Sequence, residues 1–222
     1  MGIKERRKRE KEQRRNDIID AAEKVFFSKG YDLATMDDVA DEAELSKGTL
    51  YLYFKNKEDL YMGITQRGLE ILQHKFIKAV ESHTRGIEQI RAIGDAYCEF
   101  AKKHSNYFRS MTYFHSHILE NVADASFSES EAQEGIKVLQ ICAQALSQGI
   151  ADGSIRPDIN PMKVAIILWG QTTGILQLAM GLGKHMAGKF EQFHFADVDD
   201  IISTSFQLIR FALESEKKGG RT

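Results

Sequence analysis

Four neighbouring residues of this chain could bind the phosphate oxygens of a nucleic acid. Lys47 carries an ammonium, Thr49 a hydroxyl and Tyr51 a phenol. Gly48 has no side chain that would hold a sugar-phosphate strand away. Ser46 directly precedes them and is a good N-cap for a helix that contains all four. Because such groups at the start of a helix commonly contact phosphates, this segment predicts a nucleic-acid-binding helix.

A second short helix precedes this one. Thr35 and Asp38 have the spacing of a capping box, in which each side chain bonds the other residue's backbone N–H. A narrow apolar stripe follows at helical spacing, formed by Met36, Val39, Ala40 and Ala43. Glu44 and Leu45 then form a turn that Ser46 ends. The block from Thr35 to Lys57 therefore predicts two helices joined by a three-residue turn, the geometry that places a helix in the DNA major groove.

Charge is segregated along this block. Residues 46–57 contain three lysines and no acid, whereas residues 32–44 contain six acids and no base. A solvated surface without a partner rarely shows such asymmetry, but it is expected if only the second helix and its exit face phosphate. DNA binding is the function that these observations favour.

The N-terminal arm, residues 1–15, is strongly basic. Residues 4–15 carry eight Lys or Arg and three Glu, a local net of +5 in a chain whose total is −2. Basic arms beside a recognition module commonly follow a neighbouring groove or backbone strand. The mixed signs also allow a helix that extends the next one, and a solubilising tail is the other alternative. No apolar segment follows it as in a secretory signal.

Residues 16–61 carry many matches in fixed register to one known family. They are Asn16–Ala22, Val25, Phe26, Gly30, Tyr31, Thr35, Val39, Ala40, Ala43, Leu45–Tyr51, Tyr53, Phe54 and Lys57–Leu60. On these residues the sequence resembles the TetR family of one-component transcriptional regulators. One departure is Glu44, because the family usually has glycine at this position of the turn. If Glu44 must adopt a positive φ, a side chain there costs about 1–2 kcal/mol.

The resemblance implies roles for individual residues of the DNA-binding head, residues 16–60. The phosphate contacts that it implies are Thr35, Ser46, Lys47, Gly48, Tyr51 and Lys57. The implied base contacts are Thr49 and Tyr53, although Tyr53 suits packing beneath the helix equally well. A twofold dimer would present two such helices to double-stranded DNA. We therefore expect a pseudo-palindromic site with half-sites about 34–36 Å apart or a multiple of that distance.

Composition predicts an all-α protein. The chain has two prolines and few alternating β-branched runs, and its length suffices for one small and one medium domain. We expect a helix–turn–helix DNA-binding domain of three helices at residues 16–60, and a larger helical ligand-binding and dimerisation domain at residues 61–222. Cys98 and Cys142 lie in apolar helical patterns and indicate buried free thiols in a reducing, cytoplasmic compartment.

Six further helices are expected after Leu60, with a polar linker near residues 121–130. The segment Val164–Gly183 has 20 residues without a formal charge and contains Gly170 and Gly174 four residues apart, so it could be a membrane span. Gln171, Thr172, Thr173 and Gln177 are poorly suited to lipid, and we reject that interpretation. Burial against its own domain on one side and a partner subunit on the other explains the run better, with a last helix around residues 198–213 completing the contact. A homodimer is therefore predicted.

The resemblance also implies a pocket for a small effector among the middle helices. The residues that could form its wall are Tyr97, Phe100, Met111, Phe114, Cys142, Trp169, Thr173 and Gln177. Each of them also has an interpretation as ordinary core. Apolar walls with a few polar groups suit a hydrophobic or amphipathic molecule. His115 and His117 do not share a helix face, which argues against a metal site, and no cofactor is expected.

These predictions combine into a ligand-released repressor. An effector that favours a splayed dimer would move the helix that begins near Lys57 and release the operator. An enzyme is not expected, because the sequence has no Gly-rich phosphate loop, nucleophile elbow or metal-ligand spacing. The alternative is a helical small-molecule-binding or scaffold protein whose DNA-binding head is weakened, for which Glu44 is the supporting residue.

Overall fold

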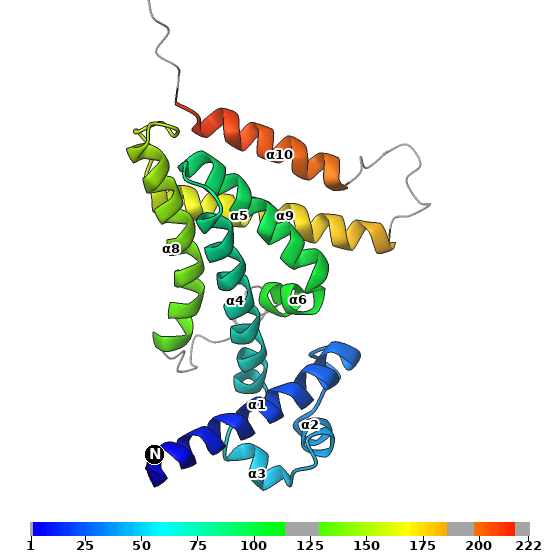
Figure 1. Cartoon of the computed structure of the whole chain (residues 1–222). Helices are drawn as coiled ribbons and strands as arrows, with labels where there is room; N and C mark the ends of the chain where they lie inside the picture. The colour runs from blue at the N-terminus through cyan, green and yellow to red at the C-terminus, as the bar shows by residue number, and fades with distance from the viewer. Residues whose placement is uncertain (1, 114–128, 186–197, 216–222) are drawn as a thin grey trace, which may run out of the picture. The chain divides into compact units, whose positions relative to one another are not determined.

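The computed structural model describes residues 2–113, 129–185 and 198–215 (Figure 1). Its helices are α1 (Ile3–Lys29), α2 (Met36–Glu42), α3 (Lys47–Tyr51), α4 (Lys57–Glu81), α5 (Gly86–Lys103), α6 (Ser105–Tyr113), α8 (Glu129–Ala151), α9 (Pro161–His185) and α10 (Val198–Leu213). The predicted all-α class is confirmed for these residues, whose only extended pairing is an isolated bridge between Ile155 and Glu214. Among the described helices, none combines the length and apolar character that a membrane span requires.

The chain divides into two compact units. The first comprises residues 1–69 with residues 105–128, and the second comprises residues 70–104 with residues 129–222. Helix α4 contributes its first half to one unit and its second half to the other. Helix α6 follows α5 directly in the sequence but belongs to the first unit.

The core of the first unit joins α1, α2, α3 and the start of α4. Ile18, Val39, Leu50, Phe54 and Ile64 are almost fully buried in it. Burying side chains of this size contributes about 1.5–3 kcal/mol each. The short helices α2 and α3 are therefore held by packing against α1 and α4, because helices of five to seven residues are not stable alone.

Both predicted helix caps are confirmed. Thr35 Oγ1 accepts from the Asp38 backbone N–H at 3.1 Å, and Asp38 Oδ2 accepts from the Thr35 N–H at 3.0 Å. Ser46 Oγ accepts from the Thr49 N–H at 3.2 Å. The turn is longer than the three residues predicted. It comprises residues 43–46, because α2 ends at Glu42 and Ala43 is its C-cap.

The turn contains the non-glycine residue that the sequence marked. Glu44 has φ 54°, in the left-handed region, and among the described residues no other non-glycine residue has a positive φ. The turn therefore forms as in a glycine-containing motif, at a conformational cost of about 1–2 kcal/mol.

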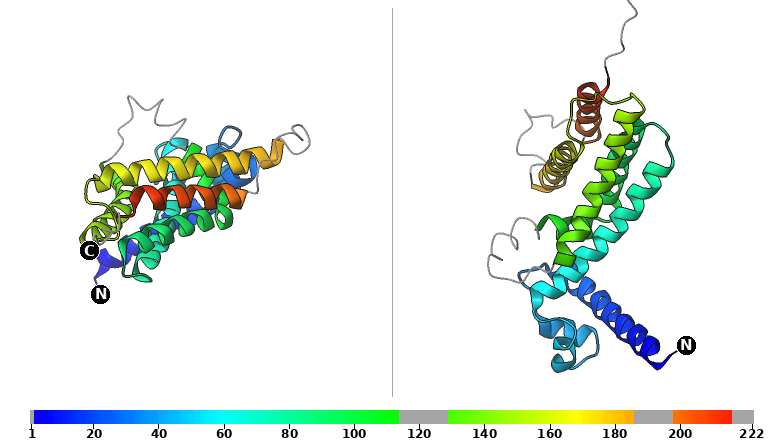
Figure 2. Two further views of the ribbon diagram at one scale, coloured as in Figure 1. Left: turned by 90° about the horizontal axis from the view of Figure 1, so that it is seen from above. Right: turned by 90° about the vertical axis from the view of Figure 1, so that its left-hand side faces the viewer.

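Helix α1 includes the basic arm. The helix begins at Ile3, and its first residue buried in the core is Ile18. Residues 2–14 are all exposed, and in the right-hand view of Figure 2 this end of α1 extends away from α2 and α3. Of the two alternatives for the arm, the structure has the helical extension.

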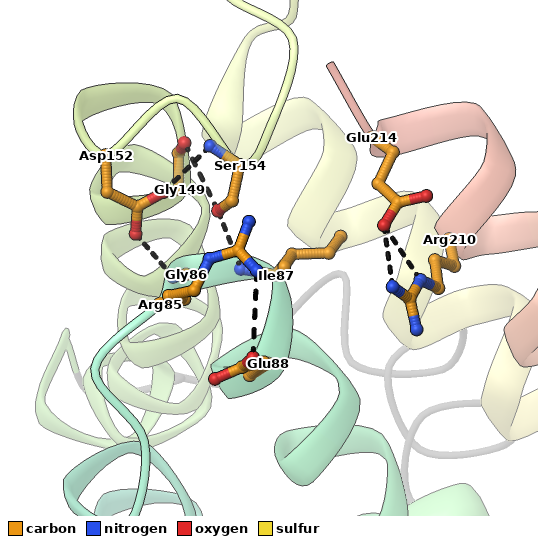
Figure 3. A network of polar contacts seen from close by, with 9 residues as sticks. All are labelled: Arg85, Gly86, Ile87, Glu88, Gly149, Asp152, Ser154, Arg210 and Glu214. Atoms are coloured by element: carbon orange, nitrogen blue, oxygen red, sulfur yellow. Dashed lines mark hydrogen bonds and ion pairs between the residues drawn. The ribbon is translucent and has the colours of Figure 1, made fainter. Parts of the chain in front are cut away.

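In the second unit, α5 begins against the end of α8 (Figure 3). The backbone N–H groups of Gly86 and Ile87 donate to Asp152 Oδ2 at 2.7 Å and to Ser154 Oγ at 3.2 Å. A Cβ on Gly86 would lie 2.1 Å from the backbone N of Gly149. Gly86 and Gly149 thus permit α5 and α8 to cross closely, and the turn after α8 caps α5.

Helices α9 and α10 lie side by side and antiparallel (Figures 1 and 2). Gln171 Nε2 of α9 donates to Ser205 Oγ of α10 at 3.1 Å. One side of α9 is buried through Ala165 and Leu176. The name apolar stripe denotes the exposed residues Ile166, Ile167, Gly170, Leu178, Ile201, Leu208 and Phe211 of the two helices, together with the half-buried Gly174.

Candidate nucleic-acid interface and effector cavity

Helix α3 separates a buried side from an exposed side. Leu50 and Phe54 anchor it in the core, whereas Lys47, Gly48 and Tyr51 are exposed. The nearest atom to a Cβ placed on Gly48 would be Ser46 Oγ at 4.0 Å, so the space around this glycine is open. The predicted phosphate-binding residues of α3 therefore share an accessible surface.

The polar groups of this surface have partners within the head. Lys47 Nζ lies 2.7 Å from Asp37 Oδ1, and this carboxylate raises the pKa of the lysine. The hydroxyl groups of Ser46 and Thr49 share a hydrogen bond of 2.8 Å, in which either can be the donor. Thr35 is exposed, and its hydroxyl caps α2. A phosphate would compete with or add to these bonds.

Lys57 and Tyr53 lie at the exit of the motif. Lys57 Nζ sits 4.4 Å from the centre of the Tyr31 ring and donates to the Asp32 carbonyl at 3.3 Å. Tyr53 is half-buried and packs against the core of the head. Its packing role is thus visible, and the base contact remains a prediction.

The acidic run of α2 has a structural use that the sequence did not indicate. Asp37 pairs with Lys47, Asp38 with Lys29 at 2.7 Å, and Glu42 with Lys24 at 2.8 Å. These contacts join α2 to α1 and α3. No fixed spacing in the sequence marks such pairs, because their partners come from other helices.

Helix α6 contributes aromatic side chains to the first unit, a contact that sequence reasoning also missed. The Tyr107 hydroxyl donates to Glu23 at 2.8 Å, and the Tyr113 hydroxyl donates to Asp32 at 2.8 Å. Burial, together with the hydrogen bond to Glu23, raises the pKa of Tyr107 to about 12. Both hydroxyls therefore remain protonated donors at neutral pH, and they connect α6 to α1 and to the residues that follow it.

The second unit contains a cavity of about 790 Å³, within the usual size of small-molecule sites. Residues of α4, α5, α8, α9 and α10 line it. Its apolar wall consists of Phe76, Ala79, Ile87, Ile90, Ile93, Tyr97, Val138, Leu139, Cys142, Ala165, Leu168, Trp169, Phe206 and Ile209. The arrangement suits an effector with a substantial apolar part.

Three of the eight predicted pocket residues line this cavity: Tyr97, Cys142 and Trp169. Thr173 lies next to it, with its hydroxyl 2.8 Å from that of Tyr97. The other described candidates are placed elsewhere. Phe100 is fully buried in the core, Met111 belongs to α6 of the first unit, and Gln177 is exposed. Phe114 lies outside the described residues, as do His115 and His117.

Basic side chains also line the cavity, and the sequence did not predict them there. They are Lys75, Lys78, Arg85, Arg91 and Arg210, and three acids, Glu88, Asp95 and Glu99, accompany them. Arg91 pairs with Asp95 at 2.9 Å and stacks over Phe206 at 4.5 Å. Lys75 lies 3.6 Å from Glu99, Arg85 3.8 Å from Glu88 and Arg210 2.8 Å from Glu214. The lining is therefore apolar and also carries paired charges. These charged residues come from several helices and have no common spacing, so no sequence pattern identifies them as neighbours.

Both cysteines are buried free thiols, as predicted. Burial raises the pKa of Cys98 to about 11 and that of Cys142 to about 12. Neither thiol is therefore an activated nucleophile at neutral pH. In the part of the chain that the structure describes, no group of three or more His, Cys, Asp or Glu could hold a metal ion.

Two family models match the chain. Residues 18–63 match "Bacterial regulatory proteins, tetR family", and residues 90–204 match "Tetracyclin repressor-like, C-terminal domain". The first match contains α2, α3 and the start of α4, and the second contains the residues from α5 to the middle of α10. Together they cover more than half of the chain.

Curated relatives are transcriptional regulators. The chain is 33% identical over 99 residues to the HTH-type transcriptional activator FasR of Mycolicibacterium smegmatis, which is 45% of each chain. It is 30% identical over 153 residues to the uncharacterized HTH-type transcriptional regulator YhgD of Bacillus subtilis, covering 68% of this chain and 76% of the relative. The match to FasR thus spans less than half of that protein.

Solved structures share the fold. A transcriptional regulator FadR from Bacillus subtilis, in complex with stearoyl-CoA, superposes with TM-score 0.68 at 18% identity, covering 88% of this chain and 97% of that chain. The ketosteroid transcriptional regulator KstR2 of Mycobacterium tuberculosis gives TM-score 0.61 at 18% identity, with 91% and 96% coverage.

Proposed function

We propose that this chain, which belongs to the TetR family of bacterial regulatory proteins and is a DNA-binding transcription regulator, represses transcription as a homodimer. The homodimer would bind a pseudo-palindromic operator, and an effector would release it from that operator. The observation that carries this proposal is α3, whose Lys47, Gly48 and Tyr51 are exposed while Leu50 anchors the helix. The curated relatives include an activator and a repressor, so they differ in the sign of regulation, and repression by this chain is our own proposal.

The first part of the proposal concerns DNA contacts. Thr35, Ser46, Lys47, Tyr51 and Lys57 bind phosphates, and Gly48 allows a strand to approach. Thr49 and Tyr53 reach base edges in the major groove. The basic residues of the first turns of α1 add phosphate contacts, and this is supported by their exposure on a continuous helix.

The second part concerns dimerisation. The apolar stripe of α9 and α10 places Ile166, Ile167, Leu208 and Phe211 in solvent in a single chain. Ile166, Gly170 and Leu178 share one face of α9 at helical spacing, and exposed apolar residues gathered in this way support an interface. A second copy seated on the stripe would bury it, and Gly170 and Gly174 would let the two α9 helices approach closely. Twofold symmetry would then match the operator.

The third part concerns the effector. We expect an amphipathic anion: the apolar wall would take a hydrocarbon part, and Lys75, Lys78 and Arg85 would take an anionic head. The head would compete with Glu99, which lies 3.6 Å from Lys75, and with Glu88, which lies 3.8 Å from Arg85. The similar FadR structure holds stearoyl-CoA, a molecule of this class. A long-chain acyl thioester of CoA is therefore the first probe to test.

Release of DNA would follow from a shift between two dimer states. Helix α4 lines the cavity at Lys75 and Phe76 and begins at Lys57, at the exit of the DNA-binding motif. An effector that prefers another position of α4 would change the spacing of the two recognition helices. The same coupling requires that DNA weaken effector binding by an equal factor.

We further propose that the chain has no enzymatic activity and acts in the cytoplasm, where chromosomal DNA lies. The buried, protonated thiols and the apolar cavity support a binding role rather than a catalytic one.

Selection from a pool of randomised DNA duplexes tests the proposal. We expect the bound fraction to converge on a twofold-symmetric consensus, and stearoyl-CoA to dissociate the complex while CoA or stearate alone does so less. Absence of enrichment at low salt would contradict DNA binding. Enrichment without any response to the acyl thioester would contradict only the proposed class of effector.

A further inference from the structure

Leu52 is an exposed leucine in the middle of the DNA-binding motif. It follows the last residue of α3 and still has helical backbone angles, φ −74° and ψ −21°. Its side chain is 78% exposed, whereas Leu50, two residues before it, is fully buried. Leu52 therefore contributes little to the core of the head, and its apolar side chain is available to a partner.

Its direction follows from helix geometry. Residues four apart share a face of a helix, and residues two apart lie on nearly opposite sides. Leu50 and Phe54 form the buried side, so Gly48 and Leu52 form the side that lies furthest from the core. Thr49 lies between the two sides, and its hydroxyl is bonded to that of Ser46. The side chain of Leu52, at the C-cap of α3, thus lies on the side away from the core.

The absence of a side chain at Gly48 would let DNA come closer to Leu52. The space around its Cα is open, so the outer side of α3 offers no side chain one turn before Leu52. A helix that enters the major groove with this side inward would bring Leu52 to the base edges. A leucine cannot bond a phosphate or a base acceptor. The thymine C5-methyl group is the apolar feature that distinguishes base pairs in the major groove.

We propose that Leu52 reads a thymine methyl group in each half-site and so selects an A·T pair at one position. This inference rests on the proposed DNA-binding function and adds a specificity-determining residue to it. The contact discriminates by shape and desolvation, and it is therefore insensitive to salt, unlike the contacts of Lys47.

The test removes single methyl groups from the DNA. Each dT of the duplex selected by the wild-type protein is replaced in turn by dU, which lacks only the C5-methyl group. Binding is measured by fluorescence anisotropy for the wild type, for Leu52→Ala and for Leu33→Ala. Leu33 is a matched control, since it is 77% exposed in the same head but lies outside α3.

At one position in a half-site, we expect dU to weaken wild-type binding about fourfold, the change that one buried methyl group corresponds to. Leu52→Ala should bind the dT and dU duplexes equally there, while Leu33→Ala should keep the wild-type sensitivity. The inference is overturned if Leu52→Ala remains as sensitive as the wild type, if no position is sensitive, or if the selected half-sites contain no thymine. In each of those cases a selected consensus would leave the proposed function intact, whereas failure to select any duplex would overturn both.

Discussion

The ammonium group of Lys47 lies 2.7 Å from a carboxylate oxygen of Asp37, so a cation of the recognition helix is held by an acid of the preceding helix. Both side chains are more than half exposed, and a pair of this kind contributes little to folding. DNA binding would exchange the carboxylate for a phosphate. In the complex that we propose, the acid would therefore position Lys47 and lower its attraction for DNA.

Variants of this pair should change DNA affinity in opposite directions. We expect Lys47→Ala to weaken binding to all duplexes alike and to reduce the slope of log K against log salt by about 0.9, the loss of one phosphate contact. Asp37→Asn should strengthen binding at low salt, because it removes a negative charge from the interface. Anisotropy titrations at several salt concentrations measure both. A changed sequence preference in Lys47→Ala with an unchanged slope would contradict the assignment.

Glu44→Gly should stabilise the head. Glycine adopts φ 54° without the steric cost of a side chain, so the free energy of unfolding should rise by about 1 kcal/mol. Thermal and urea unfolding followed by circular dichroism measure the difference. Glu44→Ala is the control, since it removes the carboxylate but keeps the Cβ. Equal stability of the glycine and alanine variants would show that the turn is not strained.

Gly86→Ala should destabilise the second unit by about 3 kcal/mol. The added Cβ would meet the backbone of Gly149 at 2.1 Å, and neither helix can move without loss of the cap from Asp152 and Ser154. Gly135→Ala is the control within α8, because nothing lies within 4 Å of its Cβ position. That variant should be neutral or more stable. A neutral Gly86→Ala would contradict the close crossing.

Gly170→Leu should prevent dimerisation without unfolding the monomer. In one chain, nothing lies within 4 Å of a Cβ at Gly170, so the side chain has room until a second copy approaches. Sedimentation velocity should give a dimer for the wild type and a monomer of 25.2 kDa for the variant, with unchanged helical circular dichroism. A dimer that persists in Gly170→Leu would place the interface elsewhere.

Cys142 should report on the cavity. Its thiol lines the apolar wall, and burial raises its pKa to about 12, so alkylation near pH 8 should be slow and should accelerate as pH rises, because more thiolate forms. In a Cys98→Ser background, Cys142 is the one remaining cysteine of the chain. Stearoyl-CoA should slow its labelling by a small maleimide, measured by mass spectrometry. Unchanged labelling at saturating effector would contradict occupancy of this cavity.

Local features of the structure could be predicted from the sequence. The caps at Thr35 and Ser46 depend on residues three positions away, and the buried Leu50 follows from helical spacing. The family matches bear out the resemblance that these residues indicated. Such features need no knowledge of how distant segments meet.

Contacts between distant segments could not be predicted in this way. Arg91 and Phe206 meet because Gly94 leaves space for the ring, whose nearest carbon would be 2.4 Å from an added Cβ. Residues of α5 and α10 line the cavity, and the approach of these two helices brings Arg91 of α5 and Arg210 of α10 to it. The family resemblance implied a pocket wall with Tyr97, Trp169 and Phe100, but the sequence could not distinguish cavity from core. Tyr97 and Trp169 line the cavity, whereas Phe100 is fully buried in the core.

The most direct test of the central claim is the stoichiometry and specificity of the protein–DNA complex on the selected duplex. Light scattering after gel filtration should give two protomers on one duplex, with disruption of either half-site weakening binding by at least tenfold at physiological salt. A single protomer on the duplex, or equal affinity for the selected and a scrambled sequence, would contradict a dimeric operator-binding regulator.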